Sequence, residues 1–274
     1  MKKIGYLGPK GTFSQEAVEK YMAGNLYEAV EFTSIPDIFM SLQNGHIDEA
    51  VVPVENSVEG AVSATLDMLS GDCNVKIKGE IAISIKQNLL VKPGTCLDDI
   101  KYIVSHPQAI GQCRKYLTEK FPGVEVRTVA STTLAAMDVA KGTGNSAAIA
   151  SETAARVYGL EIAERDIQDI NHNFTRFLVL SSEYAARTGN DKTSILFSTE
   201  DRPGSLYRIL EIFNLWDINM TRIESRPAKK RLGEYIFFVD IQGHIEDEDV
   251  RDALTMVRRK TSFYKFLGSY PRHQ

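Results

Sequence analysis

The segment from Asn173 to Leu180, NFTRFLVL, places an amide, a hydroxyl and a guanidinium at the start of an apolar run. Short unbroken apolar runs are typical of strands in sheets that are covered on both faces. A guanidinium at the mouth of such a strand is costly to desolvate unless an anionic group meets it. We therefore expect Thr175 and Arg176 to face a small acidic ligand.

Four further polar clusters each follow a strand-like run in the first two thirds of the chain: GPKGTFS (8–14), ENS (55–57), SHPQ (105–108) and ST (131–132). Strand and helix signals alternate in this region, which favours an α/β domain with mostly parallel sheets. Ligands of such sheets bind at the carboxyl ends of the strands, where loops and helix N-termini converge. The four clusters are therefore predicted to line one shared cleft.

Several helices in this region begin at recognisable caps. Thr12 stands three residues before Gln15, which is the spacing of a capping box, and Ser34 precedes Pro36 at the first turn of another helix. Pro107 opens a third helix, so His106 before it could be a helix cap, a ligand or an acid. These caps place helix N-termini beside the predicted cleft.

After a polar linker at 185–192, the pattern changes to a compact unit at 193–274. A strand at TSILFST leads to a helix that starts near Pro203, and INMTRIESRP and EYIFFVDIQG form two more strands joined by a hairpin through AKKRLGE. A second amphipathic helix with Val250, Leu254 and Val257 precedes a last strand, SFYKFLGSY. The order β-α-β-β-α-β is that of a ferredoxin-like domain.

Composition excludes several classes of protein. The chain has 274 residues, 43% of them hydrophobic, and a net charge of -4 that gives no basic footprint for nucleic acid. The basic cluster RPAKKR (226–231) lacks interleaved aromatic residues, which favours a solvated hairpin over a phosphate site. No apolar run is long enough for a signal-peptide core or a membrane span. Three widely spaced cysteines fit neither a disulfide framework nor a zinc site, so we expect a cytoplasmic protein.

The sequence carries none of the common nucleotide-binding, zinc-protease or serine-hydrolase motifs. Hydroxyls, amides, helix N-termini and one arginine remain, and these groups bind carboxylates without a metal or a cofactor. Two classes of function stay open. One is an enzyme that acts by proton transfer and electrostatics, and the other is a two-lobed protein that only senses a small acid.

The motifs together resemble those of the prephenate dehydratase family. The resemblance is carried in order by GPKGTFSQEA (8–17), VPVENSVEG (52–60), SHPQAIGQC (105–113), the Ser131-Thr132 pair, AAIAS (147–151) and NFTRF (173–177). PGSLYRIL (203–210) and IESRP (223–227) resemble the ACT regulatory domain that is fused to that enzyme. The likeness covers nearly the whole chain.

The resemblance implies an α/β catalytic domain at 1–184 with two lobes arranged like a type II periplasmic binding protein, and a βαββαβ ACT domain at 193–274. Lobe 1 would comprise about 1–78 and 172–184, and lobe 2 about 79–171. The family is a carbon–oxygen lyase that converts prephenate to phenylpyruvate, CO2 and water in phenylalanine biosynthesis. Because aromatisation drives the reaction, no cofactor and no metal are expected. A relative that accepts arogenate, or a non-catalytic sensor, is the alternative.

The family motifs imply roles for individual residues. Thr175 would donate a hydrogen bond to the leaving hydroxyl, and Arg176 would anchor a substrate carboxylate, so that its loss would weaken substrate binding. Glu55 either orients the site or, with a raised pKa, is the acid in place of Thr175. The substrate-binding residues implied by the resemblance are Thr12, Phe13, Asn56, Ser57, Ser105, Gln108, Ser131, Thr132, Asn173 and Phe177.

In the ACT-like part the resemblance implies an inhibitory phenylalanine bound between a helix and a strand of the partner subunit, in a homodimer or homotetramer. A small residue of the family's usual Gly-Ala-Leu is replaced in Gly204-Ser205-Leu206 by a serine of nearly the same size. Asn219, Glu224 and Ser225 offer acceptors for an amino group. The expected effector site comprises Gly204, Ser205, Leu206, Asn219, Glu224, Ser225, Arg226 and Pro227.

Overall fold

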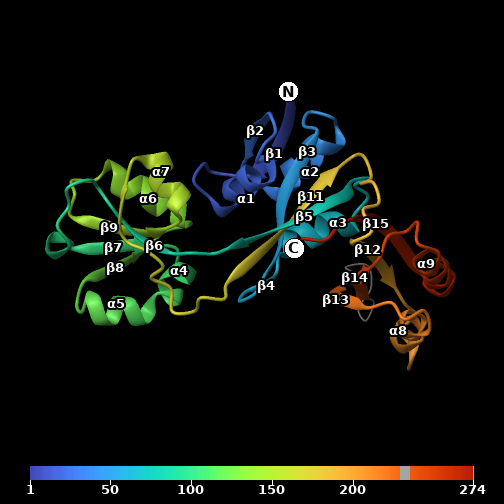
Figure 1. The fold of residues 1–274 in the computed structure, drawn as a ribbon. Helices are drawn as coiled ribbons and strands as arrows, with labels where there is room; N and C mark the ends of the chain where they lie inside the picture. Colours follow the sequence, from blue (N-terminus) through green and yellow to red (C-terminus); the bar gives the residue numbers. More distant parts are fainter. Residues whose placement is uncertain (229–234, 274) are drawn as a thin grey trace.

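A computed structural model describes residues 1–228 and 235–273, which form three sheets. Figure 1 shows three bodies in a row, with the N-terminal lobe in the middle. A green lobe lies on one side of it, and the orange and red C-terminal domain lies on the other side. The expected α/β architecture of two lobes and a third domain is confirmed.

Lobe 1 is built around the sheet order β2-β1-β3-β11-β5, with the short β4 paired to β3. Its buried side chains come from both faces of this sheet and from the helices that cover them. The elements are β1 (Lys2–Leu7), α1 (Phe13–Met22), β2 (Tyr27–Phe32), α2 (Ile35–Gln43), β3 (Glu49–Asn56), β4 (Gly60–Ala61), α3 (Ser63–Ser70), β5 (Lys76–Ser84) and β11 (Phe174–Ser181).

Lobe 2 has the sheet order β10-β6-β9-β7-β8 and two buried clusters, one on each face. Its elements are β6 (Asn88–Val91), the 3-10 turn η1 (Leu97–Asp99), β7 (Tyr102–Ser105), α4 (Pro107–Gln112), α5 (Arg114–Lys120), β8 (Glu125–Thr128), α6 (Thr132–Lys141), β9 (Ser146–Ala150), α7 (Glu152–Tyr158) and β10 (Glu161–Glu164).

Two details differ from the sequence expectation. Both sheets are mixed and not mostly parallel, because β11 runs antiparallel to β3 and β5, and β6 runs antiparallel to β9 and β10. The first crossing to lobe 2 comes after Ser84 and not near Gly79, because all of β5 pairs with β11 in the lobe 1 sheet. The chain crosses between the lobes in the non-strand segments 85–87 and 165–173.

The C-terminal domain has the predicted β-α-β-β-α-β order and the sheet order β13-β14-β12-β15. Its elements are β12 (Asp191–Ser198), α8 (Ser205–Leu215), β13 (Met220–Pro227), β14 (Tyr235–Gln242), α9 (Glu248–Lys260) and β15 (Phe263–Pro271). The end of the expected linker, from Asp191, already belongs to β12. The expected basic hairpin falls largely on residues 229–234, outside the described residues. Within residues 1–228 and 235–273, no helix combines the length and the apolar character of a membrane span.

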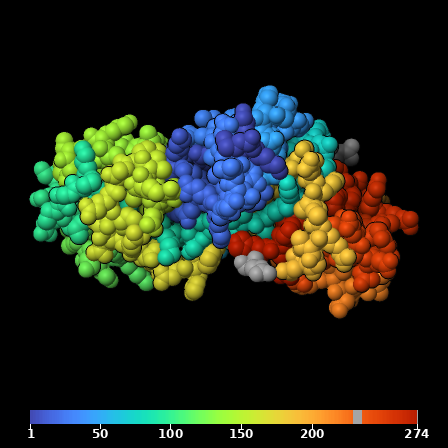
Figure 2. Space-filling model, turned by 45° about the horizontal axis from the view of Figure 1, so that its top comes forward, coloured from blue at the N-terminus to red at the C-terminus, as the bar shows by residue number. Residues whose placement is uncertain are grey.

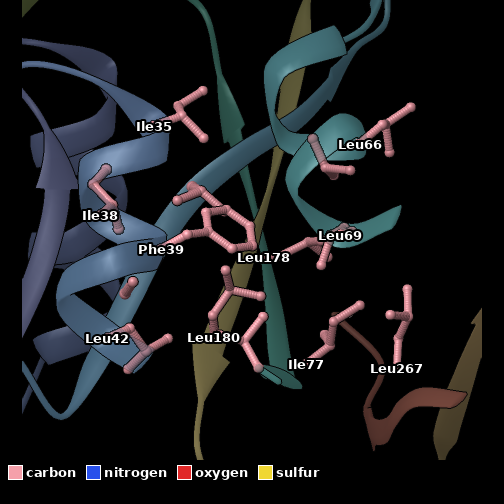
Figure 3. Packing of buried hydrophobic residues seen from close by; sticks show 14 of the residues in the cluster. Ile35, Ile38, Phe39, Leu42, Leu66, Leu69, Ile77, Leu178, Leu180 and Leu267 are labelled. Atoms are coloured by element: carbon pink, nitrogen blue, oxygen red, sulfur yellow. The ribbon is translucent and has the colours of Figure 1, made fainter. Parts of the chain in front are cut away.

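The C-terminal domain packs directly on lobe 1. Leu267 and Tyr270 of β15 belong to the same buried cluster as Ile77, Leu178 and other lobe 1 side chains, and Figure 3 shows Leu267 next to Ile77. Lys265 Nζ donates to the backbone carbonyls of Leu69, Gly71 and Cys73 at 2.7 to 2.9 Å, in the last turn of α3 and just after it. A shared apolar core makes the domain part of the lobe 1 body, unlike a domain on a free tether.

Gly268 lets β15 approach β5, and its replacement tests the docking. Its φ is +149°, and a Cβ atom there would collide with the Ile77 carbonyl oxygen. We expect Gly268→Ala to lower the unfolding free energy by about 2 kcal/mol or more, since rigid backbone must move. Gly24→Ala is the matched control, because Gly24 has φ +85° and open space around it. Equal denaturation midpoints for the two variants would contradict the close approach.

Candidate functional site

A cleft with a volume of about 460 Å³ lies between the two lobes. All four polar clusters that were predicted to converge contribute to its wall, which confirms the expectation of one shared cleft. Of the expected substrate-binding and catalytic residues, it contains Thr12, Phe13, Asn56, Gln108, Ser131, Thr132, Asn173, Thr175 and Phe177. Two other hollows, of about 350 and 440 Å³, lie on lobe 2 around Phe121 and share no residue with the cleft.

The lobes also touch beside this cleft. Ser151 Oγ of lobe 2 donates to the Gly11 carbonyl at 2.9 Å, and Tyr158 Oη donates to the Lys10 carbonyl at 2.7 Å. Gly11 has φ +93°, and a Cβ atom there would lie 3.2 Å from the Ala154 Cα. Figure 2 shows the blue N-terminal segment in contact with the yellow-green part of lobe 2. A loop of lobe 1, directly before Thr12 of the cleft wall, is therefore in contact with lobe 2.

Two helices present their N-termini to the cleft. Thr12 caps α1, accepting from the Gln15 amide at 3.3 Å, and Ser131 caps α6, accepting from the Leu134 amide at 3.1 Å. The cap at Thr12 was predicted from the sequence by its spacing to Gln15. Because the caps satisfy only some of the amides in each first turn, the remaining amides and the positive ends of the helix dipoles suit an anionic ligand.

The Asn56 side chain makes the hydroxyl oxygen of Thr175 a hydrogen-bond acceptor. Its Oδ1 accepts from the Val58 and Glu59 amides at 2.9 and 3.0 Å, which sets the orientation of the carboxamide. Its Nδ2 consequently faces β11 and donates to Thr175 Oγ1 at 2.9 Å and to Asn173 Oδ1 at 2.7 Å. With Oγ1 already an acceptor, the hydroxyl hydrogen of Thr175 is available for a group in the cleft.

Several polar residues in the wall were missed by sequence reasoning. Gln87 Oε1 and Thr133 Oγ1 are buried without a hydrogen-bond partner among the described residues, and both residues line the cleft. Such atoms are costly to bury unless a ligand or water meets them. Gln87 lies in the short segment that joins β5 of lobe 1 to β6 of lobe 2, and no motif marked it. Thr133 directly follows the Ser131-Thr132 pair, which is the signal that could have found it.

Ser105 and Ser57 do not line the cleft, although both were expected to bind substrate. Ser105 is fully buried and donates to the Ile149 carbonyl at 2.6 Å, so its hydroxyl joins β7 to β9. Ser57 Oγ bridges the His172 carbonyl and the Phe174 amide at 3.2 and 2.9 Å. Both hydroxyls hold the backbone at the cleft.

His106 lines the cleft and caps α4, because its Nδ1 accepts from the Gln108 amide at 3.3 Å. The neutral ring therefore carries its proton on Nε2. Of the open possibilities for this residue, the structure shows the cap.

Arg176 and Glu55 point away from the cleft. Consecutive residues of a strand face opposite sides of its sheet, so if Thr175 and Asn56 face the cleft, their neighbours do not. The Arg176 side chain is 13% exposed, and it meets carboxylates of the protein itself in place of the expected substrate carboxylate. Both carboxylate oxygens of Glu55 contact guanidinium groups, one from Arg176 and the other from Arg222. The two residues face the ACT-like domain.

Burial and the neighbouring charges shift the pKa values of Asp240 and Arg176 in opposite directions. Burial alone would raise the pKa of Asp240, but Arg176, a hydrogen bond from Ser194, and Arg222 hold that pKa below its ordinary value. Burial likewise disfavours the Arg176 cation, yet Asp240, Tyr270, Glu55 and Glu80 raise the pKa of its guanidinium. The groups thus remain charged because they are paired.

The expected effector residues lie on α8 and β13 or, for Gly204 and Asn219, directly before them. Gly204 precedes α8 with φ +79°, and Ser205 lines a hollow of about 380 Å³ that contains Arg208 and the α9 C-terminus. Ser198 of β12 and Arg226 of β13 both pair with Ile236, so the two strands end at the same edge of the sheet. The hollow contains none of the expected residues of β13.

Fold and site together define a two-lobed α/β domain with a cleft for a small acidic molecule, joined to a ferredoxin-like domain. The prephenate dehydratase family model matches residues 4–185, and the ACT domain model matches residues 193–255. The chain belongs to the prephenate dehydratase family and carries an ACT domain.

Relatives and solved structures agree with this assignment. A protein named prephenate dehydratase from Methanocaldococcus jannaschii is 41% identical, and the match covers 98% of each chain. The crystal structure of a prephenate dehydratase from Arthrobacter aurescens in complex with L-Phe has a TM-score of 0.90 and 36% identity, over 98% of this chain and 90% of that one. GqqA, described as a novel type of quorum quenching acylase, also has a TM-score of 0.90, with 28% identity over 99% and 98% of the chains. Overall shape therefore does not by itself decide the chemistry.

Proposed function

We propose that the chain is a prephenate dehydratase, which converts prephenate to phenylpyruvate, CO2 and water in the cleft between the lobes. The observation that carries this proposal is the directed hydroxyl of Thr175. Asn56 donates to its oxygen at 2.9 Å, so its hydrogen is left to polarise a leaving oxygen in the cleft. Family membership supplies the substrate class.

The reaction breaks two bonds that join substituents to the substrate ring. The electron pair of the ring–carboxylate bond moves into the ring as CO2 departs, and the ring carbon opposite loses its hydroxyl. The leaving hydroxide takes one proton from solvent and becomes water. Thr175 donates a hydrogen bond to that oxygen while negative charge develops on it, which is where a fixed donor accelerates a reaction most. Asn56 in turn strengthens Thr175 as a donor by donating to it.

The two substrate carboxylates need positive partners, and within the described residues the wall of the cleft contains no lysine or arginine. The N-termini of α1 and α6 take this role through their free amides, aided by the side-chain amide of Gln108. This replaces Arg176 as the expected anchor.

An assay of phenylpyruvate formation tests the function. Prephenate should be turned over, arogenate should be a poor substrate, and an acylated amide of the kind that acylases cleave should not react. Without turnover of prephenate the proposal fails, and amide cleavage in its place would assign the chemistry of the acylase.

Regulation belongs to the same proposal. L-Phenylalanine binds at the ACT domain, with Gly204 and Ser205 at the N-terminus of α8 as donors for its carboxylate. Binding lowers turnover, and paired ACT domains of a homodimer or homotetramer complete the site. We place the protein in the cytoplasm, a setting supported by three cysteines that are free thiols. Adding phenylalanine to the assay should therefore reduce the rate.

A further inference from the structure

Six charged side chains meet where lobe 1 contacts the ACT domain. They comprise three cations and three anions, so their formal charges cancel. Lobe 1 supplies Glu55, Glu80 and Arg176, and the ACT domain supplies Lys192, Arg222 and Asp240.

Arg176 is the centre of this cluster. Its Nη1 donates to Glu80 at 3.0 Å and its Nη2 donates to Asp240 at 2.8 Å. Its Nε lies 2.8 Å from Glu55 Oε1, although the N–H does not point along that contact. Arg222 Nε lies 2.6 Å from the other oxygen of Glu55. A lobe 1 arginine thus pairs with an ACT carboxylate, and an ACT arginine pairs with a lobe 1 carboxylate.

The cluster is separated from the cleft by one strand layer. In the pairing of β11 with β3, Thr175 lies opposite Asn56 and Arg176 lies opposite Glu55. The pairing shifts by a bulge directly after Arg176. A bulge re-aims the side chains around it and is held by the contacts that those side chains make. Glu55 and Arg176 therefore hold the backbone that carries Asn56 and Thr175 through contacts on the face of the sheet opposite the cleft.

We propose that Glu55 and Arg176 are positioning residues, through which Arg222 and Asp240 of the ACT domain hold Asn56 and Thr175 in the geometry that the reaction needs. The inference rests on the proposed function, and it assigns to the ACT domain a part in basal turnover. Arg222 lies on β13 together with Glu224 and Ser225, two of the expected effector residues. A shift of that strand when effector binds would reach Asn56 through Arg222 and Glu55.

The test compares Arg222→Gln, Glu55→Gln and the double variant, with kcat, KM and thermal unfolding measured for each. Each single variant should lose about 10-fold in kcat, with KM within about 2-fold of the wild type. The double variant should also lose about 10-fold, and not about 100-fold, because the two residues act through one contact. Single variants that keep the wild-type kcat, or losses that multiply, would overturn the proposal.

Lys265→Met is the matched control for domain docking. Lys265 joins the ACT domain to the end of α3 but lies outside the cluster. The variant should unfold at a lower temperature and keep the wild-type kcat. If this variant lost as much kcat as Arg222→Gln, the cluster would affect turnover only by docking the ACT domain on lobe 1. That result would overturn the proposal.

A second measurement needs no substrate. The side-chain amide of Asn56, observed by NMR in the full chain, should shift in Arg222→Gln and stay in place in Lys265→Met. An unmoved Asn56 signal in Arg222→Gln would contradict the inference even if prephenate proved not to be the substrate. Failure of the wild type to form phenylpyruvate would instead contradict only the proposed function.

Discussion

Thr175→Ala should lower kcat by about 100- to 1000-fold and leave KM within a few-fold of the wild type. The hydroxyl hydrogen is aimed at charge that develops only as the substrate hydroxyl leaves, so its loss raises the barrier without weakening ground-state binding. The comparison is made by steady-state formation of phenylpyruvate from prephenate. A loss confined to KM would make Thr175 a binding residue.

Two variants separate chemistry from structure at this position. Thr175→Ser keeps the hydroxyl and should retain most of the activity, whereas Thr175→Val keeps the shape and should behave like alanine. Stability should change by about 1 kcal/mol or less, since the Asn56 amide retains acceptors on Asn173 and Phe174. Full activity in Thr175→Val would remove the hydroxyl from the mechanism.

The cleft itself could be predicted from sequence because its determinants are local. Thr12 is a cap that can be recognised from Gln15 three residues later, and strand–helix alternation brings such loops to one edge of a sheet. Thr175 was placed correctly in the cleft by its motif. Its role in the reaction is a proposal that the experiments above test.

The predicted direction of the Arg176 side chain was wrong, and part of the reason could be seen in the sequence. Two consecutive strand residues cannot both face one cleft, and alternation alone favoured Thr175 or Arg176 but not both. The anions that meet Arg176 could not be predicted, because Glu80 and Asp240 lie on other strands, one of them in another domain. The prediction that the guanidinium must meet an anionic group was right, and only the identity of that group was wrong.

Arg176→Leu is the change with the largest expected effect on stability. It would leave Asp240 and Glu80, with side chains 6% and 3% exposed, without their guanidinium partner. Breaking a buried ion pair from one side costs about 3–5 kcal/mol, because the remaining charge stays desolvated. Chemical denaturation should therefore show a much lower midpoint, and Arg165→Leu, at an exposed ion pair with Glu152, should show little change.

The same variant has a defined pH dependence. In the wild type the pKa of Asp240 is held below its ordinary value of 3.8, so its contribution to stability is present at neutral pH and lost only as pH falls through that low value. Without Arg176, only Ser194 and Arg222 oppose the effect of burial, so we expect this pKa to rise and the charged aspartate to destabilise the fold at neutral pH. The stability gap between wild type and variant should therefore narrow as the pH is lowered from about 7 to about 4. A stability gap that stays constant with pH, together with a raised KM for prephenate, would indicate that Arg176 binds a substrate carboxylate. Removing a cation that binds ligand in the cleft leaves no buried carboxylate of the protein unpaired.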